Sequence, residues 1–194
     1  MTWLVAGLGN PGERYANTRH NLGYRVVDEL ASRERERFRK TRFLAADTAE
    51  IRYAGDRVVL AKARSFMNES GPPIASLARK HGVDPEHVIA VHDEIDLAFG
   101  ALRVKVGGST AGHNGLRSLE RGLRSSDFYR VRLGVGRPPG LRDPGDYVLD
   151  AFPKREEAEV AALVDDGADA VLSLVSEGLQ VTQDRYNRSA PRER

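Results

Sequence analysis

The sequence contains no cysteine among its 194 residues. Disulfide bonds, thiolate nucleophiles and cysteine-ligated zinc are therefore excluded. Long apolar runs are also missing, because no stretch approaches the roughly 18 residues that a membrane span requires. The N-terminus has no basic region ahead of its apolar run, which a secretory signal peptide needs. We therefore expect a cytoplasmic protein with no membrane partner.

The composition is typical of one soluble globular domain. Hydrophobic residues make up 40% of the chain and charged residues 30%. A chain of this length buries one α/β core well, whereas two full domains would be cramped. We expect one domain over residues 1–187, a disordered tail over residues 188–194, and a monomeric protein.

Charge is distributed unevenly along the chain. Residues 1–150 hold 24 lysines and arginines against 19 acidic residues, whereas residues 151–194 hold 6 against 9. Arginine accounts for 25 of the 30 basic side chains, and arginine binds phosphate with paired hydrogen bonds and stacks on bases. This bias favours an anionic partner on the first three-quarters of the chain. A GC-rich genome that encodes arginine in place of lysine is an alternative explanation.

Hydrophobic patterning predicts alternating strands and helices. Apolar runs bounded by turn residues predict strands at residues 2–8, 43–53, 57–63, 88–91, 101–106 and 129–135, with a short edge strand at 147–149. Helical spacing of apolar residues predicts helices at residues 21–37, 74–82, 116–123, 153–177 and 179–186. A turn at residues 54–56 joins two of the strands into a hairpin. This order predicts a single three-layer α/β domain, with a mixed twisted sheet flanked by helices.

Residues 7–12 match the G-x-G-x-x-G pattern of dinucleotide-binding sites. Such a site needs a helix that opens on the glycines and an acidic residue at the end of a second strand. Here the chain continues as a loop, and the acids at the expected distance, Asp28 and Glu29, fall inside a predicted helix. We interpret the glycines as a tight turn that presents Asn10 at the end of the first strand.

His20 lies at the predicted start of the first helix. It stands between Arg19 and Asn21, and helical spacing begins just after it at Leu22, Val26, Val27 and Leu30. Catalytic side chains are frequent on loops that a rigid scaffold holds in place. The alternative is that Thr18 or Asn21 caps the helix and that His20 is merely exposed.

Polar side chains stand at the ends of several predicted strands. Asn10, Asn68 and Asp93 each follow a strand, and ligands of open α/β sheets bind at the carboxyl ends of strands. A histidine oriented by a carboxylate is a general base, and asparagine amides can bind a peptide or an oxyanion. Because there is no G-x-S-x-G elbow and no cysteine, we expect water to be the nucleophile. For each asparagine taken alone, a turn or a helix cap is the alternative.

Segments of the chain match the motifs of one known family, in the same order. They cover residues 7–12, 15–23 with 26–28, 66–71, 92–97 and 112–119. On these segments the chain resembles the bacterial peptidyl-tRNA hydrolases, and the similarity extends from the first strand to about residue 187. Residues 109–111 of the glycine-rich loop and the tail at 192–194 depart from the family pattern.

The resemblance implies an enzyme that cleaves the ester between a peptide and the 3′-terminal ribose of tRNA, with residues 1–187 as its catalytic domain. His20 would activate water, Asp93 would orient His20, and Asn10 would bind the peptide near the ester. Further residues implied to bind the peptide, the water or the 3′ CCA end are Asn68, Asn114, His113, Tyr15 and Phe66. Lys105 and Arg132 resemble the family's clamp for the 5′ phosphate of tRNA. The resemblance implies no metal and no cofactor, because an ester is already an activated acyl group.

Other classes of function remain open from the sequence. A metal hydrolase could use His20, Asp93 and His113 as ligands, although no H-E-x-x-H motif supports it. A nucleotide-binding oxidoreductase rests on the glycine pattern alone. A non-catalytic tRNA-binding protein would explain the arginines but not the set of histidine, aspartate and asparagine residues.

Overall fold

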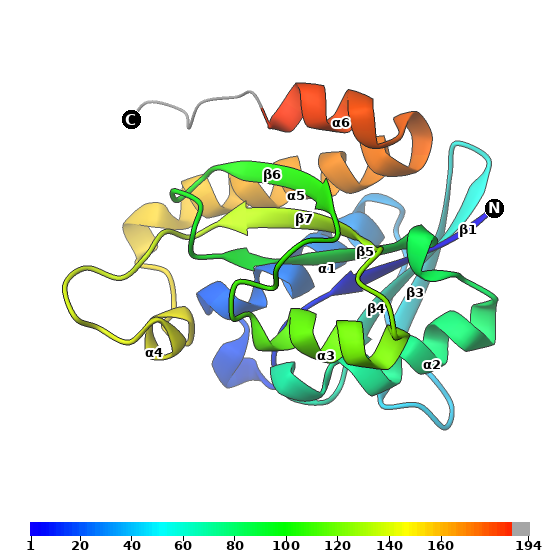
Figure 1. Ribbon diagram of the computed structural model, residues 1–194, viewed down its shortest axis with the longest axis horizontal. Coiled ribbons are helices and arrows are strands. Elements are labelled where there is room, and N and C mark those ends of the chain that lie inside the picture. Colours follow the sequence, from blue (N-terminus) through cyan, green and yellow to red (C-terminus); the bar gives the residue numbers. More distant parts are fainter. Residues whose placement is uncertain (188–194) are drawn as a thin grey trace.

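A seven-stranded mixed sheet forms the centre of the protein (Figure 1). The structure is a computed structural model, and it describes residues 1–187. The strand order is β2-β3-β4-β1-β5-β7-β6. The parallel strands are β1 (Thr2–Gly7), β4 (Asp56–Ala63), β5 (Val88–Glu94) and β7 (Tyr129–Gly134). The antiparallel pairings are those of β3 (Ala46–Tyr53) with β4, β6 (Leu102–Val106) with β7, and β2 (Arg39–Lys40) with β3.

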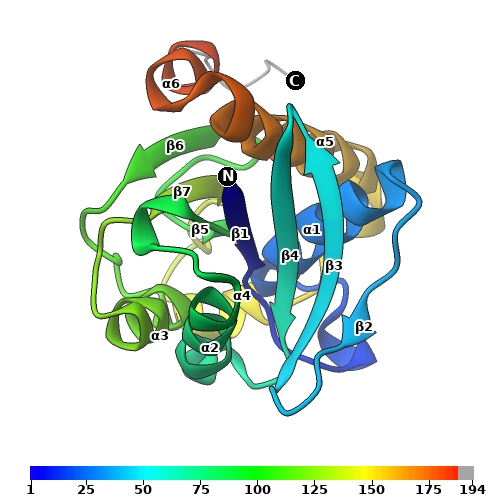
Figure 2. The ribbon, with the colours of Figure 1, turned by 90° about the vertical axis from the view of Figure 1, so that its right-hand side faces the viewer.

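Helices cover both faces of the sheet, as Figure 2 shows. One face carries α1 (Leu22–Arg33) and α5 (Glu157–Glu177), and the other carries α2 (Gly71–His81) and α3 (Asn114–Leu123). Helix α6 (Leu179–Tyr186) packs along the edge strand β6. The prediction of a three-layer α/β fold with a mixed sheet is therefore confirmed. The predicted tail at residues 188–194 lies outside the described residues.

The central strand β5 shows why the sheet is buried on both sides. Val88 and Ala90 point into the core beneath α2 and α3, whereas Ile89 and Val91 point into the core beneath α1 and α5. A strand covered on both faces reads as a continuous apolar run rather than an alternating one. The strand continues through His92, Asp93 and Glu94, so it carries polar side chains to the carboxyl edge of the sheet.

One sequence prediction has the wrong secondary structure. Residues 147–149 were expected to form an edge strand, but they belong to the helix α4 (Pro144–Val148) and its C-terminal end. Asp143 caps this helix by accepting from the backbone N–H groups of Gly145 and Asp146, and Pro144 occupies the first turn. The Asp-Pro pair was a helix-start signal that the loop composition concealed.

Other boundaries differ by a few residues. Helix α1 ends at Arg33 rather than at residue 37, and the strand expected from residue 43 begins at Ala46. No α-helix opens on the glycine run at residues 7–12. A short 3₁₀ turn, Glu13–Tyr15, follows it, and the first α-helix begins at Leu22. Across residues 1–187, no helix is both long enough and apolar enough to cross a membrane.

A glycine sets how closely α1 approaches the sheet. A Cβ atom added at Gly23 would lie 2.2 Å from the carbonyl oxygen of Val91 and 2.5 Å from the backbone nitrogen of Leu8. Only a residue without a side chain fits there. The N-terminal end of α1 therefore lies directly against the ends of β1 and β5, which is where the polar residues gather.

Candidate active site

A pocket of about 340 Å³ opens at the carboxyl ends of β1 and β5. Ligands of parallel sheets bind at this edge. The polar residues that line the pocket are Asn10, His20, Asn68, Asp93, Glu94, His113 and Asn114. Apolar and small residues of α4 and its flank also line the pocket, namely Pro144, Gly145, Val148 and Leu149. The structure thus brings together most of the site residues predicted from the sequence.

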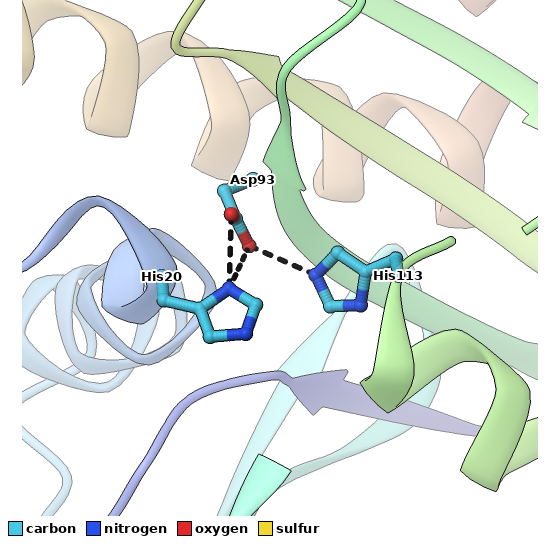
Figure 3. Close-up of side chains that lie close together, drawn as sticks. All are labelled: His20, Asp93 and His113. Atoms are coloured by element: carbon cyan, nitrogen blue, oxygen red, sulfur yellow. Dashed lines mark hydrogen bonds and ion pairs between the residues drawn. The ribbon is translucent and has the colours of Figure 1, made fainter. Parts of the chain in front are cut away.

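His20 and Asp93 form a hydrogen-bonded pair (Figure 3). The Nδ1 atom of His20 lies 3.0 Å from both carboxylate oxygens of Asp93. Because a carboxylate accepts, the hydrogen is on Nδ1 and the neutral ring keeps a lone pair on Nε2. His20 belongs to the short 3₁₀ turn Arg19–Asn21 that immediately precedes α1. The close approach of α1 to the sheet is what brings this turn within reach of Asp93.

His113 contacts the same carboxylate from the other side (Figure 3). Its Nε2 atom lies 2.9 Å from Oδ1 of Asp93. Its Nδ1 atom accepts from the backbone N–H groups of Gly115 and Leu116, so His113 is the N-cap of α3. These contacts place the ring hydrogen on Nε2. Asp93 therefore accepts hydrogen bonds from two imidazoles at once.

Burial and charge act in opposite directions on the central pair. Burial is the largest effect on His20 and lowers its pKa, but the charge of Asp93 and the hydrogen bond to it together outweigh burial and raise the pKa above 6.5. Burial favours a raised pKa for Asp93, yet the neighbouring His20 and His113 hold that pKa well below its usual range. Asp93 is therefore ionised, and His20 is more basic than an ordinary histidine.

A third histidine supports the backbone beneath the pair. His92 is fully buried, and its Nδ1 donates to the carbonyl oxygen of Asp93 at 2.8 Å. Burial and the neighbouring His113 hold the pKa of His92 well below 6.5, so its ring is neutral. The ring of His92 also meets that of His113 edge-on, with centroids 5.0 Å apart. Sequence reasoning missed this contact of His92, because nothing in the sequence shows the direction of its side chain.

Asn10 is held in one orientation. Its side-chain oxygen accepts from the backbone N–H of Met67 at 2.8 Å, so the Nδ2 group is the end left for the pocket. The backbone of Asn10 is in turn fixed by Asn21, which accepts from its N–H and donates to its carbonyl, both at 2.9 Å. Asn21 was considered as a helix cap, but its side chain makes no capping bond to α1. Sequence reasoning therefore missed its contact with Asn10.

Asn68 and Asn114 line the pocket with exposed side chains. Asn68 lies in a 3₁₀ turn after β4, and Asn114 is the first residue of α3 rather than part of the preceding loop. Neither amide has a hydrogen-bond partner within residues 1–187. Both are free to bind a ligand or water.

Tyr15 and Phe66 lie together but do not line this pocket. Their rings pack edge to face, with centroids 6.3 Å apart. Phe66 is 57% exposed, although it directly precedes the buried Met67 that holds Asn10. The two rings therefore form an aromatic surface next to the pocket.

Lys105 and Arg132 are also outside the pocket, on the neighbouring strands β6 and β7. Arg132 donates through Nε and Nη2 to one oxygen of Glu94, at 3.1 and 2.9 Å. Burial lowers the pKa of Lys105, and repulsion from Arg132 and Arg130 lowers it further. Lys105 and Arg132 are thus close enough for their charges to interact, and Glu94 connects them to the pocket wall.

His20, Asp93 and His113 offer ligand atoms that all lie within 4.8 Å of one another. A metal on Nε2 of His113 would require the ring hydrogen to move to Nδ1. Nδ1, however, already accepts two backbone N–H groups at the start of α3. Since a neutral histidine ligand donates from its other nitrogen, this geometry fits hydrogen bonding to Asp93 better than metal binding.

Known proteins of one family resemble the chain over nearly its whole length. The family model described as peptidyl-tRNA hydrolase matches residues 4–194. The peptidyl-tRNA hydrolase of Kineococcus radiotolerans is 50% identical over 195 residues, which cover 97% of this chain and 98% of that protein. That of Frankia alni is 50% identical over 185 residues, which cover 95% and 93%.

Solved structures agree with the sequence relatives. The crystal structure of peptidyl-tRNA hydrolase from Acinetobacter baumannii superposes with a TM-score of 0.88 at 30% identity, covering 98% of this chain and 96% of that one. A 5′-methylthioadenosine nucleosidase from Arabidopsis thaliana reaches a TM-score of 0.52 at 7% identity, which is a likeness of fold alone. Sequence, coverage and fold therefore agree that the chain is a hydrolase and belongs to the peptidyl-tRNA hydrolase family.

Proposed function

We propose that this protein hydrolyses the ester between the peptide and the 3′-terminal ribose of peptidyl-tRNA, releasing free peptide and free tRNA. The observation that carries the proposal is the His20–Asp93 pair, in which Nδ1 of His20 is held at 3.0 Å from the carboxylate. This bond leaves Nε2 of His20 as a base beside the pocket. Its cytoplasmic partner would be any peptidyl-tRNA from stalled or abortive translation.

His20 acts as the general base for water. Nε2 takes a proton as the water oxygen attacks the ester carbonyl, and Asp93 stabilises the imidazolium that forms. The tetrahedral intermediate then collapses, the bond to the ribose 3′ oxygen breaks, and His20 returns the proton to that oxygen. No side chain becomes covalently attached to the substrate.

The asparagines bind the two reactants. Nδ2 of Asn10 donates to a peptide carbonyl near the ester, since its oxygen is already used by Met67. Asn68 also binds the peptide near the ester, and Asn114 holds the attacking water or the 3′ end. Such neutral amides suit a substrate whose peptide sequence varies.

His113 has a different role from the substrate binding that the resemblance implied. Both of its ring nitrogens are engaged, one by Asp93 and the other by the start of α3. It therefore positions Asp93 rather than contacting substrate. The bond from His113 also leaves less of the Asp93 charge for His20, which keeps His20 from binding its proton too tightly.

The tRNA is held away from the reacting bond. The half-buried ring of Tyr15 and the exposed ring of Phe66 stack on the terminal nucleotide or contact the peptide, because every base offers a π face. Lys105 and Arg132 bind the 5′ phosphate. Contacts of this kind position an RNA without reading its sequence, which fits an enzyme that accepts any elongator tRNA.

The second candidate function, that of a non-catalytic tRNA-binding protein, has less support. It would need the basic residues but not a buried carboxylate shared by two histidines. The test is release of free tRNA from N-acetyl-aminoacyl-tRNA, with unblocked aminoacyl-tRNA as the comparison substrate. Binding without turnover would favour the second candidate, and loss of turnover on adding a chelator would favour a metal enzyme.

The variant His20→Ala makes this test specific. We expect its turnover to fall by the roughly 10²–10⁴-fold typical of a lost general base. Its affinity for tRNA should stay close to that of the wild type. His81→Ala is the matched control, because His81 ends α2 and lies outside the pocket. Full activity in His20→Ala would exclude the proposed mechanism.

A further inference from the structure

Arg19 is a buried cation next to the proposed base, and the reaction does not use it. Arg19 is only 7% exposed, and within residues 1–187 its guanidinium makes hydrogen bonds to backbone carbonyls but no ion pair with a carboxylate. A buried charge without a counter-ion must be compensated in another way. The contacts of Arg19 show where this compensation comes from.

All of the compensating groups belong to one segment. Nη1 of Arg19 donates to the carbonyl oxygens of Asp150 and Ala151, each at 3.3 Å. The guanidinium carbon lies 4.1 Å from the ring centroid of Tyr147 and 5.1 Å from that of Phe152. Stacking on aromatic faces combined with carbonyl acceptors is an arrangement that arginine satisfies and lysine does not.

The main chain joins the same two segments. The N–H of Arg19 donates to the carbonyl of Asp150 at 3.1 Å, and the N–H of Phe152 donates to the carbonyl of Asn17 at 3.2 Å. Thr18 and Ala151 form an isolated antiparallel bridge. Each segment therefore donates a main-chain hydrogen bond to the other, which joins the turn that carries His20 to the segment that follows α4.

On its other side, helix α4 is connected by an irregular segment, whose ion pairs are Arg137 with Asp96 and Arg142 with Asp150. Before α4 the chain runs through residues 137–143, which have no regular secondary structure and include the fully exposed Leu141. Figure 1 shows α4 standing apart from the sheet on this long connection. The pocket face of α4 nevertheless forms one wall of the site through Val148 and Leu149.

We propose that Arg19 is a positioning residue that holds the α4 wall against the turn carrying His20 and so sets the width of the pocket around the ester end of peptidyl-tRNA. This inference rests on the proposed function for the identity of the ligand. In this role Arg19 acts on the pocket wall and not on the substrate itself. It acts through Tyr147, whose hydroxyl makes no hydrogen bond within residues 1–187, so the ring face is the part that matters.

The position of His20 does not depend on Arg19. His20 is fixed by Asp93, and the turn is fixed by the paired hydrogen bonds between Asn21 and Asn10. Loss of the Arg19 contacts should therefore release the wall but leave the base in place. Substrate binding weakens, whereas the chemical step is preserved.

The experiment compares Arg19→Lys, Tyr147→Leu and the conservative Tyr147→Phe with Arg25→Lys, a control on α1 whose arginine pairs with Glu157 away from the pocket. We expect Arg19→Lys and Tyr147→Leu each to raise KM for N-acetyl-aminoacyl-tRNA about tenfold, with kcat and its pH profile changed less than about threefold. Their double variant should be no worse than the stronger single variant, because both remove one contact. Tyr147→Phe and Arg25→Lys should behave like the wild type.

Hydrogen exchange of the full-length protein without substrate gives a second readout. In Arg19→Lys, the amides of α4 should exchange faster, while those of α1 and β5 stay as protected as in the wild type. Faster exchange throughout would mean a structural role only. An unchanged KM, or a lower kcat with a shifted pH profile, would overturn the proposal. If the wild type itself shows no turnover, the proposed function fails, while the exchange of α4 still decides whether Arg19 holds the wall.

Discussion

The Asn10 amide offers the pocket a donor and not an acceptor, because its oxygen binds the backbone N–H of Met67. From sequence alone, either end of the amide was available. The Nδ2 donor of Asn10 can pair with a carbonyl of an N-blocked peptide. It cannot pair with the ammonium of an unblocked aminoacyl-tRNA, because both groups are hydrogen-bond donors. We therefore propose that Asn10 makes the protein prefer N-blocked peptidyl-tRNA to unblocked aminoacyl-tRNA.

The variant Asn10→Asp tests this selectivity. One carboxylate oxygen can still accept from Met67, while the other places a negative charge toward the pocket. We expect lower turnover of N-acetyl-aminoacyl-tRNA and a preference over aminoacyl-tRNA that narrows by about tenfold or more, since an unpaired buried group costs about 1–3 kcal/mol. The measurement is the ratio of kcat/KM for the two substrates. An unchanged ratio would show that Asn10 does not discriminate between the two substrates, and Asn68 and Asn114 would be the next residues to test.

Residue types and their places at strand ends were readable from the sequence, but their directions were not. Asn10, Asn68 and Asp93 could be expected at one edge because parallel strands end together. The sharing of Asp93 by His20 and His113 depends on contacts between segments 73 and 20 residues apart in the chain. No local pattern encodes a tautomer or the orientation of an amide, so the contacts of His113 and Asn21 became apparent only in three dimensions.

At the scale of secondary structure, long amphipathic segments were predictable and short ones were not. Helix α6 has the expected bounds, Leu179–Tyr186, and the hairpin of β3 and β4 turns where expected. The strand β2 has only the residues Arg39–Lys40, both exposed, and so carries no burial pattern. Helix α4 was missed because its short length gives periodicity little weight against a loop rich in proline and glycine.

The position of His20 depends on the close contact between helix α1 and the sheet. Gly23→Ala would place a methyl group against backbone atoms of Val91 and Leu8, which cannot move aside. We expect a loss of at least about 3 kcal/mol in the free energy of unfolding, in spite of the roughly 1 kcal/mol that alanine gains in a helix, together with loss of activity.

Gly167→Ala is the matched control for this prediction. Its Cβ would meet only side-chain atoms of Val26 and Leu133, at 3.0 and 3.1 Å, and these can adjust. Its effect on the free energy of unfolding should stay within about 1 kcal/mol. Urea denaturation of both variants provides the comparison. Similar losses in the two variants would show that backbone proximity at Gly23 is not what fixes α1.

For the molecule as a whole, the basic residues proposed to bind tRNA lie apart from the proposed catalytic pair. Lys105 and Arg132 lie on β6 and β7, outside the pocket that holds His20. Arg132 already forms an ion pair with Glu94, so a bound phosphate would have to share the Arg132 guanidinium with that carboxylate. The general excess of arginine predicted an anionic partner, but composition alone could not show which arginines were committed to ion pairs.

Lys105→Ala and Arg132→Ala should therefore lower kcat/KM for substrates that carry a tRNA body. Hydrolysis of a short ribose ester should be nearly unaffected. The dependence of tRNA binding on salt should become shallower by about one unit of slope for each lost contact. Arg103 offers a control on the same strand as Lys105, with a guanidinium bonded to the carbonyl of Tyr186. Equal losses of activity on both substrates would show that Lys105 and Arg132 contribute to the fold or to catalysis rather than to tRNA binding.

The most direct test of the central claim is the pH dependence of kcat/KM for wild type and Asp93→Asn. The proposed mechanism requires neutral His20, whose pKa Asp93 raises above 6.5, so wild-type kcat/KM should rise with pH through a midpoint above 6.5. In Asp93→Asn the charge is gone while burial remains, so the midpoint should fall below 6.5 as the plateau drops by at least about tenfold. His92 does not contribute, because its pKa lies well below this range. A midpoint that stays where it is in the wild type would contradict a base made by the His20–Asp93 pair.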